Sequence, residues 1–217
     1  VPVTNPETLK AALADAYGCQ FLLLGRSELL ADEPEWATGL EDESDLKRAA
    51  LQSMRSSDEK PTPKEVDREV GRVLSSREIQ ATLQAVEDRG GSATYLSVDI
   101  TRPQALEDAL AGYKEQITGL LHGAGALADK YIDEKGEDDF DLVYGVKVDG
   151  LHHMLSLVPP QQLDFIILFS SVAGFYGNAG QADYALGNEV LNKYAHTLQH
   201  QYPDCRVLAL DWGPWDG

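Results

Sequence analysis

Four residues in the second half of the chain have types and spacings that suit carbonyl chemistry. Tyr184 follows Ser171 by thirteen positions, Asn188 lies one helical turn beyond Tyr184, and Lys147 precedes all three. Reduction of a carbonyl by hydride transfer needs a proton donor, a second donor that holds the carbonyl oxygen, and a cation that lowers the pKa of the proton donor. A phenol, a hydroxyl and an ammonium supply these functions, so this set is a candidate reductive site.

Each of these residues also has an ordinary structural explanation. Tyr184 could be a core tyrosine with a satisfied hydroxyl, and Lys147 could be a surface lysine. The stretch 169–188, FSSVAGFYGNAGQADYALGN, could be a glycine-rich loop and a helix start that serve packing only. Taken together, these explanations do not account for the residue types falling at spacings that one reaction requires.

Alternating strands and helices must position these side chains. Short apolar runs predict strands at 20–24, 94–98, 116–121, 164–169 and 205–210. Helical patterns lie between them at 6–17, 102–114, 137–157 and 179–201. The strands are continuous apolar runs, which is typical of parallel sheets covered by helices on both faces. We therefore predict a doubly wound, Rossmann-like α/β fold in a single domain over 1–217.

A long connection between the first two predicted strands interrupts this pattern. It contains two helix signals, ESDLKRAALQSM and a stretch that begins at Pro63 and ends at a glycine pair. A single crossover helix needs far fewer residues. We predict a helical insertion at about 33–90, which is equally compatible with a partner surface and with a solvated appendage.

Composition excludes several functional classes. The net charge of −18 disfavours nucleic acid and anionic membranes as partners. No apolar run approaches the ~20 residues of a membrane helix, and no secretory signal is visible. Cys19 and Cys205 are too few for a disulfide framework and indicate free thiols in a reducing, cytoplasmic compartment. We expect no metal site.

Several motifs together resemble one enzyme family. The stretches are LLHGAGALAD, VYGVKVDGLHHML, FIILFSSVAGFYGNAGQADYALGNEVLNKYA and VLALDWGPW. The chain resembles the ketoreductase domains of polyketide and polyunsaturated fatty acid synthases, within the short-chain dehydrogenase/reductase superfamily. Free-standing members usually carry a lysine four residues after the tyrosine. Here Asn188 is at that position and Lys147 is on the preceding helix, which is the arrangement of the synthase-embedded members.

The resemblance implies a reaction and four catalytic roles. The reaction is NADPH-dependent reduction of a β-ketoacyl thioester on an acyl carrier protein, next to other domains of the same synthase. Tyr184 would donate the proton, Ser171 would hold the β-keto oxygen, Lys147 would bind the nicotinamide ribose and assist the tyrosine, and Asn188 would complete a relay through water.

The resemblance also implies cofactor-binding and stereocontrol residues. Arg26 would lie near a 2′-phosphate, and a cation there favours NADPH over NADH. The other implied cofactor-binding residues are Ser27, Asp99, Ile100, Gly123, Ala124 and Gly125. The implied stereocontrol residues are Leu127, Asp129, Tyr176 and Gln181. Asp129 is kept from the family's Leu-Asp-Asp loop and no tryptophan stands at 176, which favours a D-configured alcohol, although Ala128 departs from the pattern.

The family's glycine-rich nucleotide turn is not found before Gly18, and nothing follows GPWDG. We therefore expect a fragment of a larger multidomain synthase. Two alternatives stay open: a non-catalytic structural subdomain of a synthase, and a free-standing reductase of a small ketone. The retention of Tyr184, Ser171 and Lys147 argues against the first alternative, and Asn188 argues against the second.

Overall fold

A computed structural model describes residues 13–16, 18–55 and 61–213. Most of the predicted first helix, the segment before it and the last four residues lie outside this range, although residues 13–16 are helical. The chain divides at Val98 and Asp99 into two compact units, apart from a short exchange within the first seven residues. Each unit is described by itself.

The first unit pairs two parallel strands with a helical connection. Strand β1 (Gln20–Gly25) pairs with β2 (Ser92–Ser97) from Gln20 opposite Ser92 to Gly25 opposite Ser97. The connection contains the 3-10 turn η1 (Glu35–Ala37), α2 (Glu43–Arg55) and α3 (Pro63–Glu87), and α3 packs on β2. Both helix signals in this stretch correspond to helices. That the stretch is an insertion stays a prediction.

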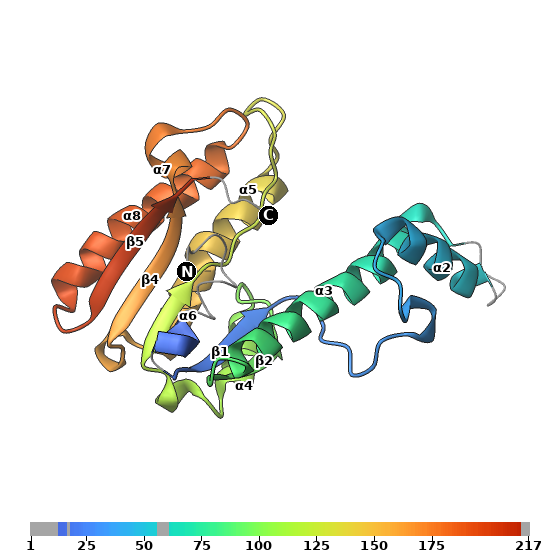
Figure 1. Ribbon diagram of the computed structural model, residues 1–217. Helices are drawn as coiled ribbons and strands as arrows, with labels where there is room; N and C mark the ends of the chain where they lie inside the picture. The colour runs from blue at the N-terminus through green and yellow to red at the C-terminus, as the bar shows by residue number, and fades with distance from the viewer. Residues whose placement is uncertain (1–12, 17, 56–60, 214–217) are drawn as a thin grey trace. The chain divides into compact units, whose positions relative to one another are not determined.

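Helix α3 has a strong start signal. The Thr62 side chain accepts a hydrogen bond from the Glu65 N–H, the Glu65 carboxylate accepts one from the Thr62 N–H, and Pro63 occupies the first turn. The first half of α3 packs against α2 (Figure 1). Their shared apolar core consists of Ala37, Leu46, Ala50, Val66, Val70 and Val73.

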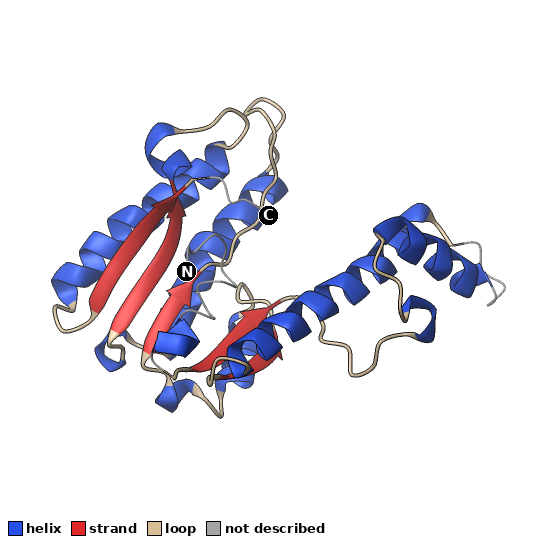
Figure 2. Cartoon of the chain, in the orientation of Figure 1, coloured by secondary structure: helices blue, strands red, loops and turns tan. Residues whose placement is uncertain are grey.

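The second unit is built on a parallel three-stranded sheet. Its strands are β3 (Gly119–His122), β4 (Phe165–Ser171) and β5 (Arg206–Trp212), in the spatial order β3-β4-β5 (Figure 2). The long helix α8 (Ala182–Gln201) packs on β4 and β5 and beside α5 (Glu137–Tyr144). The remaining elements are α4 (Pro103–Leu110), η2 (Lys114–Gln116), η3 (Gly145–Asp149), α6 (Gly150–Leu157), η4 (Pro160–Gln162) and α7 (Val172–Tyr176).

The predicted elements are present, with three local differences. The helix predicted at 137–157 is α5 and α6 joined by a π-helical turn, η3, in which the Gly150 N–H bonds to the Gly145 carbonyl. The stretch after β4, predicted as a loop, forms the short helix α7, because the Ser171 hydroxyl caps it. Residues 114–116 form a 3-10 turn, so β3 begins later than predicted. Elsewhere the bounds shift by a few residues.

Two absences concern the described residues. None of the helices there combines the length and the apolar character needed to cross a bilayer. The same residues contain no group of three or more histidine, cysteine or acidic side chains arranged to hold a metal ion. Cys205 is buried, Cys19 is half-buried, and both are free thiols.

Candidate active site

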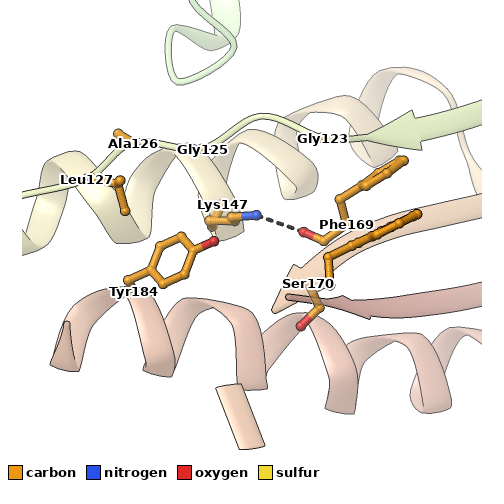
Figure 3. A pocket seen from close by; sticks show the side chains of 9 residues that line it. Gly123, Gly125, Ala126, Leu127, Lys147, Phe169, Ser170 and Tyr184 are labelled. Atoms are coloured by element: carbon orange, nitrogen blue, oxygen red, sulfur yellow. Dashed lines mark hydrogen bonds between the residues drawn. The ribbon is translucent and has the colours of Figure 1, made fainter. Parts of the chain in front are cut away.

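A pocket of about 380 Å³ opens in the second unit where its three strands end. Ligands of parallel α/β sheets bind at this carboxyl edge. The lining residues come from the segment after β3, the ends of β4 and β5, and two helices: Gly123, Gly125, Ala126, Leu127, Lys147, Phe169, Ser170, Tyr184 and Trp212 (Figure 3). Two of the four predicted catalytic residues, Lys147 and Tyr184, therefore share one pocket.

Lys147 is a buried lysine in the π-helical turn η3. Its side chain points into the pocket, and Nζ donates a hydrogen bond to the Phe169 carbonyl at 2.7 Å (Figure 3). The residue is only 4% exposed, and this burial lowers the pKa of Lys147 to about 8. Single π-helical turns inside α-helices occur often at functional sites. The prediction of a surface lysine as the ordinary explanation is therefore wrong.

Tyr184 lies in the first turn of α8, opposite Lys147. The Lys147 Nζ is 5.8 Å from the centre of the Tyr184 ring, within the range of a cation–π contact. The phenol oxygen points toward the lysine (Figure 3). A positive charge beside a phenol stabilises the phenolate that forms when the phenol gives up its proton.

Asn188 lies one turn further along α8 and is fully buried. Its Nδ2 donates to the Tyr184 carbonyl at 2.8 Å, but its Oδ1 has no hydrogen-bond partner among the described residues. The Ser170 hydroxyl bonds to the Asn188 carbonyl at 3.1 Å, which links β4 to the helix. A buried acceptor without a partner is costly and is commonly satisfied by water. Oδ1 is therefore a position where an ordered water could bind.

Ser171 is the last residue of β4 and does not belong to the pocket lining. Its Oγ accepts a hydrogen bond from the Ala173 N–H at 3.2 Å. The O–H itself is still available as a donor, because a hydroxyl has two lone pairs besides its proton. Gly177 (φ +73°) and Gly180 (φ +77°) let the chain turn between α7 and α8.

The segment after β3 forms one wall of the pocket. Gly123, Gly125 and Leu127 line it, whereas Ala124 does not. A β-carbon added at Gly125 would lie 3.4 Å from the Lys147 Cε, so glycine lets the backbone approach the lysine closely. Of the other predicted stereocontrol residues, Gln181 donates to the Asp129 carboxylate at 2.9 Å. Tyr176 is 81% exposed and contacts the Phe175 ring edge to face.

The remaining predicted cofactor residues lie outside the pocket lining. Arg26 and Ser27 follow β1 in the first unit. Asp99 accepts hydrogen bonds from the Thr101 N–H and hydroxyl, at 3.0 and 2.7 Å, which forms a tight turn at the end of β2. The Ile100 carbonyl accepts a bond from His153 Nδ1.

His122 and Trp212 belong to the site but were not predicted from the sequence. His122 ends β3 and is buried, and its Nε2–H donates to the Lys147 carbonyl at 2.9 Å. Burial lowers the pKa of His122 to about 4, so the imidazole stays neutral. Trp212 stacks on Phe169 with ring centres 6.0 Å apart. Both residues stand inside motifs quoted above, HGAGAL and LDWGPW, and that position was the only available signal.

The pocket fits the nicotinamide nucleotide that the resemblance implies. Two glycines leave the backbone of one wall open to a flat ligand. An ammonium has three N–H donors, and the bond to Phe169 uses one of those of Lys147. Ribose hydroxyls could accept bonds from the others. The acceptor without a partner on Asn188 lies on the same helix as Tyr184.

Comparison with known proteins decides the family. The sequence model of the KR domain matches residues 68–217. Over 222 aligned residues, which cover 98% of this chain, it is 39% identical to one component of the polyunsaturated fatty acid synthase of Thraustochytrium sp.. The chain belongs to the KR domain family. It spans only 8% of the length of that synthase component.

Solved structures agree with this assignment. A ketoreductase domain from the bacillaene assembly line matches with a TM-score of 0.64 and 25% identity, over 95% of this chain and 40% of that one. An N-terminal ketoreductase from the macrolactin assembly line matches with a TM-score of 0.69 and 23% identity, over 96% of this chain and 34% of that one. The Rossmann-like fold of short-chain dehydrogenase/reductases, predicted from the sequence, is confirmed for this KR domain.

Proposed function

We propose that this KR domain reduces a β-ketoacyl thioester, carried by an acyl carrier protein of the same synthase, to the β-hydroxyacyl thioester with NADPH. One observation carries the proposal: a phenol and a buried ammonium face each other in a pocket at the carboxyl edge of a parallel sheet. The cofactor, when bound, supplies the hydride for the carbonyl carbon. The roles below belong to residues of this chain.

Tyr184 is the proton donor in this proposal. Its phenol transfers a proton to the carbonyl oxygen as negative charge develops there. The Lys147 ammonium stabilises the resulting phenolate, and its low pKa makes its charge sensitive to pH. As pH rises through about 8, Lys147 loses its proton, so turnover should fall on the alkaline side.

Two further residues complete the proposed proton path. A water bound to Asn188 Oδ1 returns a proton to Tyr184 after each turnover. The Ser171 hydroxyl donates its free O–H to the β-keto oxygen while it still caps α7. Arg26 is proposed to bind the 2′-phosphate that distinguishes NADPH from NADH.

The proposal is tested by NADPH oxidation in the full-length protein with a carrier-bound β-ketoacyl thioester. Tyr184→Phe removes only the hydroxyl and should lower kcat by about 10²–10⁴-fold. Tyr194→Phe is the matched control, because Tyr194 is on the same helix but outside the pocket lining. Undiminished turnover in Tyr184→Phe would contradict the mechanism.

The same assay separates the alternatives. A structural subdomain would oxidise no NADPH with any β-keto thioester. A reductase of small ketones would turn over a free ketone as efficiently as the carrier-bound thioester. Equal kcat/KM values with NADH and NADPH would contradict the role proposed for Arg26.

A further inference from the structure

A buried ion pair joins the wall of the pocket to the start of α8. The Lys135 Nζ lies 2.7 Å from the Asp183 Oδ2 and also donates to the Ala128 carbonyl at 2.7 Å. The side chains of Lys135 and Asp183 are only 6% and 1% exposed. The two residues are 48 positions apart in the sequence, and neither was predicted as a site residue.

Both ends of this link are adjacent to pocket residues. Ala128 follows Leu127, whose side chain lines the pocket. Asp183 precedes Tyr184, and its Oδ1 accepts a hydrogen bond from the Tyr184 N–H at 2.9 Å. A continuous set of three polar contacts therefore runs from the pocket wall, through Lys135 and Asp183, to the backbone of Tyr184.

A second ion pair in the same segment shows what an ordinary link looks like here. Lys130 pairs with Asp139 at 2.7 Å, but 47% of the Lys130 side chain is exposed. Exposed pairs of this kind contribute little. A buried pair costs desolvation and is often no more stabilising than apolar packing of the same volume. Holding two segments together does not require buried charges, whereas fixing their relative position by directional bonds does.

We propose that Lys135 is a positioning residue that fixes the wall carrying Leu127 relative to Tyr184. This inference rests on the proposed function, because it concerns the same pocket. With the wall fixed, a β-keto group can present only one face while its oxygen lies near the phenol. Lys135 therefore acts on turnover and on the configuration of the alcohol, and it does so through Ala128 and Asp183 without contacting the substrate.

The test uses variants of the full-length protein. Lys135→Met/Asp183→Asn removes both charges, so no unpaired buried charge is left, and it keeps an amide oxygen for the Tyr184 N–H. Lys135→Arg keeps the charge and is the rescue variant. Lys130→Met removes the exposed pair in the same segment, keeps the backbone bond from the Lys130 N–H to the Gly180 carbonyl, and is the matched control.

Four quantities are measured: kcat and KM for a β-ketoacyl thioester, the enantiomeric ratio of the hydroxy product, the Kd of NADPH, and amide hydrogen exchange over 126–132. In the double variant we expect kcat to fall at least tenfold, the enantiomeric ratio to move toward one, and exchange to become at least tenfold faster. The Kd of NADPH should change less than threefold. Lys135→Arg should recover most of the enantiomeric ratio, and Lys130→Met should stay within twofold of the unsubstituted protein.

The outcomes separate this inference from the proposed function. If the unsubstituted protein reduces the thioester and the double variant matches it in kcat and enantiomeric ratio, the positioning role is overturned. If the unsubstituted protein reduces no β-keto thioester, the proposed function fails. Hydrogen exchange then decides whether Lys135 fixes the wall, and unchanged exchange in the double variant overturns that claim as well. Loss of kcat in Lys130→Met as large as in the double variant also overturns it.

Discussion

The helix pair α2–α3 and the region around the pocket bury different kinds of side chains. The helix pair buries an apolar cluster and keeps its charges at the surface, where Lys47 pairs with Glu43 and Asp67. The pocket region buries polar and charged groups: His122, Lys147, Ser170, Asp183 and Asn188. Burial of polar groups costs free energy unless they are paired, and such groups gather where chemistry is done. The first interior therefore serves folding, and the second, we infer, serves function.

The largest expected effect comes from removing the buried charge of the pocket. Lys147→Met keeps an unbranched side chain but deletes the ammonium that faces Tyr184, so kcat should fall by about 10²–10⁴-fold. The free energy of unfolding should change little, because the substitution also removes the cost of burying a charge. Both are measured on the full-length protein, by NADPH oxidation and urea unfolding. A large loss of stability with unchanged kcat would reverse the comparison between the two regions.

The opposite result is expected from the helix pair. Leu46 on α2 is fully buried in the apolar cluster, so Leu46→Ala should lower the free energy of unfolding by about 3 kcal/mol. The variant should keep the kcat of the unsubstituted protein at a temperature where it is folded. Leu46→Met, which conserves volume, is the control and should cost less than about 1.5 kcal/mol. Loss of kcat in the folded Leu46→Ala variant would indicate that the helix pair takes part in catalysis.

A smaller effect is expected from pH. Because the pKa of His122 is lowered from 6.5 to about 4, the unfolded chain binds a proton that the folded chain excludes between these values. His122 therefore stabilises the folded state above pH 6.5, and this contribution declines by about 2 kcal/mol between pH 7 and pH 5.

Urea unfolding of the full-length protein at several pH values measures this decline. His122→Gln should flatten the curve over that interval. His196→Gln, which replaces an exposed histidine on α8, should leave the curve unchanged. Equal slopes for the unsubstituted protein and His122→Gln would show that His122 is not held neutral.

Prediction from the sequence was best where a pattern is local. Apolar runs located all five strands, because strands buried on both faces carry continuous apolar residues. The spacing of Tyr184 and Asn188 placed both residues on one face of α8. The family and the fold class are confirmed, whereas the catalytic and cofactor roles of single residues stay predictions.

Prediction failed where the deciding contact joins distant segments. Helix α7 was predicted as a glycine-rich loop, because the capping bond of Ser171 was not recognised in that context. The π-helical turn around Lys147 was missed, since the sequence pattern continues through it without interruption. The contact of His122 with the Lys147 carbonyl spans 25 positions, and that of Lys135 with Asp183 spans 48.

The sequence by itself determined which reactive groups this KR domain has, their order, and the elements that carry them. These properties depend on residue types and on periodicities of two to four positions. Only the tertiary structure decided that Lys147 is buried with a low pKa, that Ser171 lies outside the pocket lining, and that Lys135 bonds both the pocket wall and the residue before Tyr184. Burial and hydrogen bonding are set by which distant segments pack together, and a pattern of neighbours does not contain that information.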